Sequence, residues 1–147
     1  MAYQIPSNKE EILEFTLYPG EAGTVWELET VENDQIELDY EGVATGGPAK
    51  SGTAVLQITI ADEPRYRGYV FAPGDRGVDL DGIEICKNPS EINKPVWKTE
   101  ISDAGKMLTI KIKAKQKDQY DFGFLWVVDN NGEEIRSGDP MVIVDPA

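Results

Sequence analysis

Two short stretches of the sequence concentrate side chains that could bind a ligand. The first is Arg65-Tyr66-Arg67-Gly68-Tyr69, in which two arginines and two tyrosines lie close together. A guanidinium group binds carboxylates through paired hydrogen bonds, and a tyrosine offers an apolar ring with a polar hydroxyl. Two interpretations follow: Arg65, Tyr66, Arg67 and Tyr69 bind an acidic group or a carbohydrate, or they end an amphipathic strand and pair with neighbouring acids.

The second stretch carries three aspartates, Asp75, Asp79 and Asp81, within seven residues. Carboxylate oxygens at such spacing can surround a calcium ion. The EF-hand pattern, however, requires carboxylates where this chain has Gly77 and Asn88. Aspartate is also common in turns for backbone reasons alone. The loop is therefore either a calcium site or a turn, and the sequence indicates no other cofactor.

The most informative absence is that of histidine. Without it, neither a Ser-His-Asp unit nor a Cys-His unit can form, and histidine-ligated metal sites are excluded. The single cysteine, Cys86, excludes a disulfide within the chain. A carboxylate-based hydrolase needs only two acids, but the chain has 27, and no pair stands out. We therefore expect no catalysis, with such a hydrolase as the alternative.

The chain is strongly acidic, with a net charge of −13. Contacts to phosphates are made by lysine and arginine, so nucleic acids and anionic membranes are not expected as partners. The first residues show no secretory signal, and no apolar run is long enough to span a bilayer. We expect a cytoplasmic protein.

Apolar and polar residues alternate along most of the chain, which is typical of half-buried strands. No stretch shows a helical apolar stripe. Strands are expected at residues 13–17, 26–29, 36–40, 54–60, 66–71, 78–86 with a break at 81–82, 97–101, 108–114, 120–128 and 141–144. Eight to ten short strands separated by turns predict an all-β domain over residues 1–147, built as a sandwich of two antiparallel sheets.

Two strands have faces that could also form binding surfaces. The aromatic face is expected in the core rather than as a stacking platform for sugars or bases. The lysine face is interpreted as protection of an edge strand, or as neutralisation of acids on adjacent strands. The aromatic set is Tyr120, Phe122, Phe124 and Trp126, and the basic set is Lys111, Lys113, Lys115 and Lys117.

The last third of the chain carries the most specific pattern. Tyr120 lies where the tyrosine corner of Greek-key sandwiches would lie, before the penultimate strand. The segment 128–132, Ile135 and the segment 139–143 resemble small uncharacterised bacterial immunoglobulin-like proteins, including the group called the DP-EP family. The resemblance implies an immunoglobulin-like fold with Greek-key connections. It brings no activity and no functional residues.

These observations favour a non-catalytic module that contacts another protein or assembles with itself through loops or an edge strand. The alternative is a module that binds a carbohydrate or a small ligand through Arg65, Tyr66, Arg67 and Tyr69, with or without the assistance of calcium.

Overall fold

The protein is an all-β structure in the computed structural model, which describes residues 3–6, 9–31, 34–40, 52–74, 80–87, 96–113, 122–138 and 142–145. These residues contain no α-helix. They form two short 3-10 helices, η2 (Pro64–Tyr66) and η3 (Asp103–Gly105). Their strands are β1 (Tyr3–Ile5), β2 (Glu10–Tyr18), β3 (Glu27–Leu28), β4 (Ile36–Tyr40), β5 (Thr53–Ile60), β6 (Tyr69–Phe71), β7 (Ile83–Lys87), β8 (Val96–Ser102), β9 (Met107–Lys113), β10 (Phe122–Asn130), β11 (Glu133–Arg136) and β12 (Val142–Asp145).

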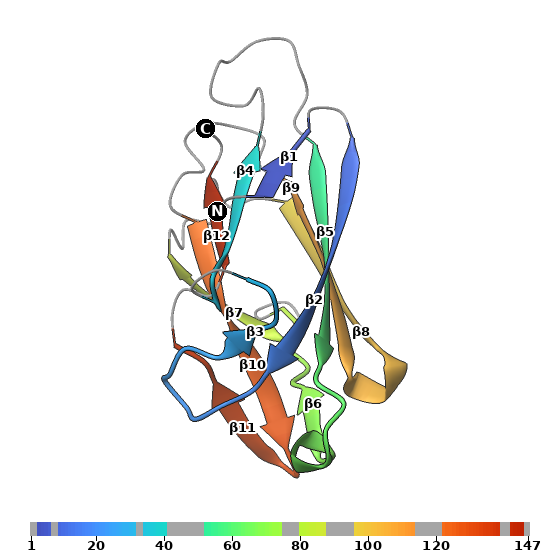
Figure 1. Ribbon diagram of the computed structural model, residues 1–147, viewed down its shortest axis with the longest axis vertical. Coiled ribbons are helices and arrows are strands. Elements are labelled where there is room, and N and C mark those ends of the chain that lie inside the picture. The colour runs from blue at the N-terminus through green and yellow to red at the C-terminus, as the bar shows by residue number, and fades with distance from the viewer. Residues whose placement is uncertain are drawn as a thin grey trace.

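The strands form two sheets that face each other (Figure 1). One is five-stranded in the order β3-β2-β5-β9-β8. The other is organised around β10, whose first part pairs with β12 and β7 and whose last part pairs with β11 and β6. β4 and β1 continue that sheet beyond β12. The expected sandwich of two sheets is present.

The sheets are mixed rather than purely antiparallel, which corrects the prediction. β2 runs parallel to β5, while β4 runs parallel to both β1 and β12. Parallel neighbours need a connection that crosses over, and here the chain crosses to the other sheet. Between β2 and β5, for example, it passes through β4 of the opposite sheet.

The core lies between the sheets and is filled by the alternating apolar residues. From the five-stranded sheet it receives Phe15, Leu17, Leu56, Ile58, Leu108 and Ile110, all buried. Phe124 and Trp126 of β10 are also buried, with exposures of 1% and 0%. The core interpretation is confirmed for these two aromatic residues. Tyr120 lies outside the described residues, as does the side chain of Phe122.

Two strands were not expected, and some expected strands are shorter than predicted, among them those at 26–29 and 66–71. β1 and β11 are absent from the prediction. In the case of β11, the segment Glu133–Arg136 has only one apolar residue, and its position depends on pairing with β10. Residues 66–71 were expected to be extended, but β6 begins only at Tyr69. Pro64 favours a helical first turn, and the amide of Tyr66 donates to the carbonyl of Glu63 at 2.9 Å.

The lysine-rich strand β9 is an interior strand of its sheet. It pairs with β5 on one side and with β8 on the other. The interpretation that its lysines protect an edge is therefore wrong. Across the sheet, Lys111 lies opposite Val55 and Lys98 rather than opposite an acid. Lys115 and Lys117 lie outside the described residues.

Candidate functional site

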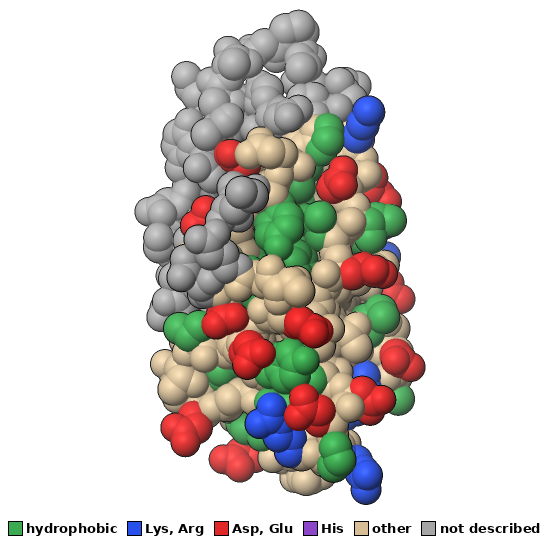
Figure 2. Space-filling model, viewed as in Figure 1, with side chains coloured by type: hydrophobic (Ala, Val, Ile, Leu, Met, Phe, Trp, Pro, Cys, Tyr) green, Lys and Arg blue, Asp and Glu red, His purple; other side chains and the backbone are tan. Residues whose placement is uncertain are grey.

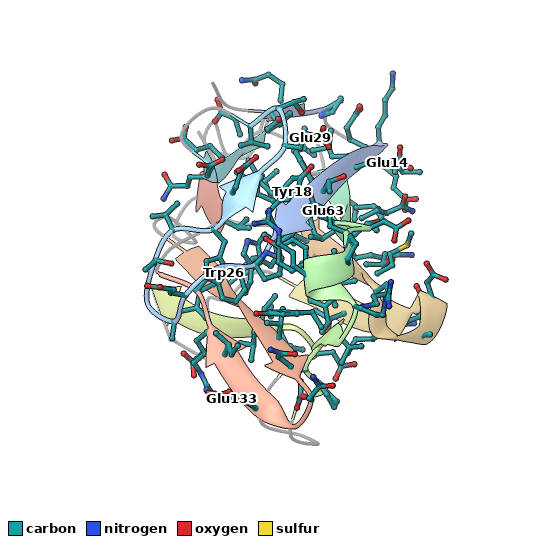
Figure 3. All side chains as sticks on the ribbon, turned by 60° about the horizontal axis from the view of Figure 1, so that its bottom comes forward. Glu14, Tyr18, Trp26, Glu29, Glu63 and Glu133 are labelled. Atoms are coloured by element: carbon teal, nitrogen blue, oxygen red, sulfur yellow. The ribbon has the colours of Figure 1, made fainter. Side chains whose placement is uncertain are left out.

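Tyr66 is the buried centre of the predicted Arg-Tyr cluster. Its ring packs edge-on against Tyr69 and Tyr18, with ring centroids 5.3 Å and 6.4 Å away. Burial raises the pKa of Tyr66 above its usual value. Figure 3 shows Tyr18 with Glu29 and Glu63 in the same part of the view, and these carboxylates add to the rise that burial causes in the pKa of Tyr18. The three tyrosines thus form a packed aromatic group. The sequence predicted Tyr66 and Tyr69 as members of this group but not Tyr18.

The two arginines of the cluster have different environments. The Arg65 guanidinium lies 4.7 Å from the centre of the Tyr66 ring, and its Nε donates to Glu63 Oε1 at 3.0 Å. The predicted pairing with a neighbouring acid is confirmed for this residue. Arg67 is exposed, and its guanidinium has no partner among the described residues. Arg67 is therefore the arginine of this cluster that remains able to bind another group.

A cavity of about 580 Å³ adjoins the cluster. The end of β5, the residues around η2 and the β8–β9 hairpin form its walls. Its polar lining includes Thr59, Asp62, Tyr66, Arg67, Asp103 and Lys106. The structure thus places Tyr66 and Arg67 at the cavity, while Arg65 and Tyr69 support Tyr66 from outside the lining.

Lys106 holds one wall of this cavity in place. Its ammonium group donates to the backbone carbonyls of Tyr66 and Arg67, at 2.9 Å and 3.1 Å, and also to that of Tyr69. Each of these carbonyls is about 40 residues away along the chain. No local sequence pattern links Lys106 to them, so sequence reasoning could not have found this contact.

The β8–β9 hairpin turns through three successive residues with positive φ. Asp103 and Ala104 both have φ of 53°, and Gly105 has φ of 91°. Positive φ is unfavourable for residues that carry a Cβ, so the hairpin tip is a strained segment. This tip supplies Asp103 and Lys106 to the cavity and closes the edge strand β8.

Of the three candidate calcium ligands, only Asp81 lies within the described residues; Asp75 and Asp79 lie outside them. Asp81 Oδ1 accepts a hydrogen bond from the amide of Gly74 at 2.8 Å, and its own amide donates to Thr99 Oγ1 at 2.9 Å. Asp81 therefore forms hydrogen bonds with both Gly74 and Thr99 of β8. In the part of the chain that the structure describes, no group of three or more acidic or cysteine side chains could hold a metal ion.

Among the described strands, β8 forms an edge of the five-stranded sheet. It pairs with β9 along all seven of its residues and has no described strand on its other side. In the lower half of Figure 1 it is the outermost strand on the right. Lys98 and Glu100 are exposed, and neither has an ion pair or side-chain hydrogen bond with a described residue. An open edge presents unpaired backbone groups to which another strand can bind.

The charges on the surface agree with the acidic composition of the sequence. Many acidic and few basic side chains lie on the face in Figure 2. A search of the described residues for a helix long and apolar enough to cross a membrane found none.

The comparisons with known proteins bear on the family of the chain. No curated protein and no solved structure shows significant similarity to it. The family model described as DP-EP family matches residues 2–146, which is nearly the whole length rather than the last third alone. The chain therefore belongs to the DP-EP family.

Proposed function

We propose that this protein is a non-catalytic association module that binds a partner strand at the open edge of β8. The single observation that carries the proposal is this edge, which is long, fully paired on its inner side and charged with both signs. Added strands gain affinity from backbone hydrogen bonds and specificity from the side chains that meet on each face. The partner is another protein or a second copy of the chain.

Peptide binding monitored by hydrogen exchange tests this function. We expect heptapeptides selected from a displayed library to slow exchange of alternate β8 amides, since only alternate amides point outward. Amides of β9 are already paired on both sides and serve as the internal control. If neither selected peptides nor high protein concentration protects β8, the module does not act through this edge.

The immunoglobulin-like, Greek-key form of the sandwich is part of the same proposal. Its support is that strands neighbouring in sequence, such as β3 and β4, belong to opposite sheets. Such crossings are typical of Greek-key sandwiches.

A second candidate function is the binding of a carbohydrate or another small polar ligand in the cavity beside Tyr66. Its support is the guanidinium of Arg67, which has no partner among the described residues, at a cavity that also offers carboxylate and hydroxyl groups. Such convergent polar groups in a concave site are typical of ligand pockets.

A glycan array screened with and without a chelator tests this candidate and its calcium dependence. We expect Arg67→Ala to weaken binding of any ligand found by about tenfold, the usual effect of losing a charge-assisted hydrogen bond. Arg65→Ala is the matched control, because Arg65 is already engaged by Glu63 and the Tyr66 ring. Equal losses in the two variants, or no ligand in either condition, would exclude this site.

A further inference from the structure

The exposed charges of β8 are arranged symmetrically about Thr99. Lys98 precedes this residue and Glu100 follows it, and both are exposed on the outer face of the sheet. Thr99 is turned to the inner face, where its hydroxyl accepts a hydrogen bond from the backbone amide of Asp81. The strand therefore carries one cation and one anion on one face, at equal distances from its centre.

This symmetry points to a second copy of the chain as the partner. We propose that two copies join through antiparallel pairing of their β8 edges, with Thr99 opposite Thr99. In this register Lys98 of each copy lies opposite Glu100 of the other. Residues that are directly opposite lie on the same face and interact, so the pairing creates two ion pairs related by a twofold axis. This inference rests on the proposed function.

The neighbouring antiparallel registers are unfavourable. A shift must keep the inner and outer faces of both strands aligned, so the next possible centres are Lys98 and Glu100. A register centred on Lys98 places two lysines opposite each other, and a register centred on Glu100 does the same with two glutamates. Like charges that face each other directly destabilise a strand pair. Charge therefore selects the register centred on Thr99.

The charge on the adjacent strand adds a second reason. Within one chain Lys98 lies opposite Lys111 of β9, and both side chains are exposed. Neither lysine has a carboxylate partner among the described residues. In the proposed dimer, Glu100 of the second copy lies on the other side of Lys98. The pairing thus supplies an anion where the isolated chain has two neighbouring cations.

The other long edge lacks this complementarity. β2 pairs with β3 only through Leu17 and Tyr18, so its first part also has no described neighbour on that side. That part carries Glu10, Glu11 and Glu14 and no base. Two copies joined there would bring together only negative charges, in a chain whose net charge is already −13. Of the two edges of this sheet, β8 is therefore the one suited to self-association.

Sedimentation velocity on charge variants tests the proposal. We expect the natural chain to dimerise within a concentration series reaching about 1 mM, a range that covers weak and transient interfaces. Lys98→Glu and Glu100→Lys should each raise the dimer dissociation constant by about tenfold or more, because both ion pairs become like-charge pairs. Both side chains are exposed, so the fold should be preserved, and circular dichroism checks this.

Variants that restore the charge complementarity between the two β8 strands provide the decisive experiment. The double variant Lys98→Glu/Glu100→Lys should dimerise within about threefold of the natural chain, since each pair is merely reversed. An equal mixture of the two single variants should form heterodimers, although each variant alone dimerises about tenfold or more weakly than the natural chain. The matched controls are Lys9→Glu and Glu133→Lys, which make the same charge changes at exposed residues outside β8 and should leave dimerisation unchanged.

Two results would overturn the inference. A natural chain that is monomeric over the whole series excludes self-pairing. A dimer that is insensitive to the single variants, or that the double variant does not restore, excludes this register. Protection of β8 by selected peptides is measured separately, so the edge can bind another protein even if the chain does not bind itself.

Discussion

Gly105→Ala is expected to lower the free energy of unfolding by about 2–4 kcal/mol, which combines the cost of a left-handed alanine with that of overpacking. Gly105 has φ of 91°, and a Cβ built on it would lie 2.7 Å from both Cβ and Cγ1 of Val70 in β6. The hairpin tip therefore packs directly against the opposite sheet. Urea unfolding followed by tryptophan fluorescence measures the loss.

Ala104→Gly is the matched control at the neighbouring position. Ala104 also has positive φ, at 53°, so glycine relieves strain there instead of creating it. We expect the free energy of unfolding to stay within about 1 kcal/mol of the natural value, because this relief is offset by the greater entropy of glycine in the unfolded chain. If Gly105→Ala were as mild as Ala104→Gly, the close approach to Val70 would be disproved.

Lys106→Met should cost about 2–3 kcal/mol of stability, the usual range for losing hydrogen bonds to a charged group. The substitution keeps much of the apolar stem but removes the donor shared by the carbonyls of Tyr66, Arg67 and Tyr69. Because these carbonyls belong to one wall of the cavity, the segment 66–69 should also loosen. Chemical denaturation measures the first effect, and hydrogen exchange of the amides in this segment measures the second.

Lys111→Met is the control for Lys106→Met. Lys111 is exposed on the outer face of β9 and lies opposite Lys98, so its loss should change stability by no more than about 0.5 kcal/mol. Equal effects of the two variants would mean that the Lys106 ammonium does not hold the turn.

These variants also separate the two candidate functions. Lys106 lines the cavity and holds one of its walls, whereas the charges that set the proposed β8 register are Lys98 and Glu100. Ligand binding in the cavity should therefore respond to Lys106→Met. Dimerisation should respond to reversal of Lys98 or Glu100.

The strands themselves were largely predictable from sequence. Residues such as Phe15 and Leu17, or Ile58 and Ile60, alternate with polar neighbours, and this alternation alone predicts one buried face. β11 escaped prediction because Ile135 is its only apolar residue, and its position depends on pairing with β10. η2 was not predicted, because the turn after Pro64 interrupts a segment whose tyrosines and apolar residues are typical of a strand.

The candidate site was predictable only in part. Arg65, Tyr66, Arg67 and Tyr69 are adjacent in sequence, so their proximity needed no fold. Which arginine lacks a partner among the described residues, however, depends on Glu63 and on the orientation of the Tyr66 ring. Tyr18 and Lys106 join the site from distant segments, and nothing near them in sequence indicates it.

The sequence by itself determined that this is an acidic chain of alternating strands without histidine chemistry or a disulfide within the chain, because composition and periodicity are local properties. Only the tertiary structure decided which strands are interior and which form edges. Lys111 of β9 and Lys98 of β8 both lie on the outer face of the sheet, yet among the described strands β9 has two neighbours and β8 has one. Strand order depends on pairings between distant segments, and that order places Lys98 and Glu100 at an open edge.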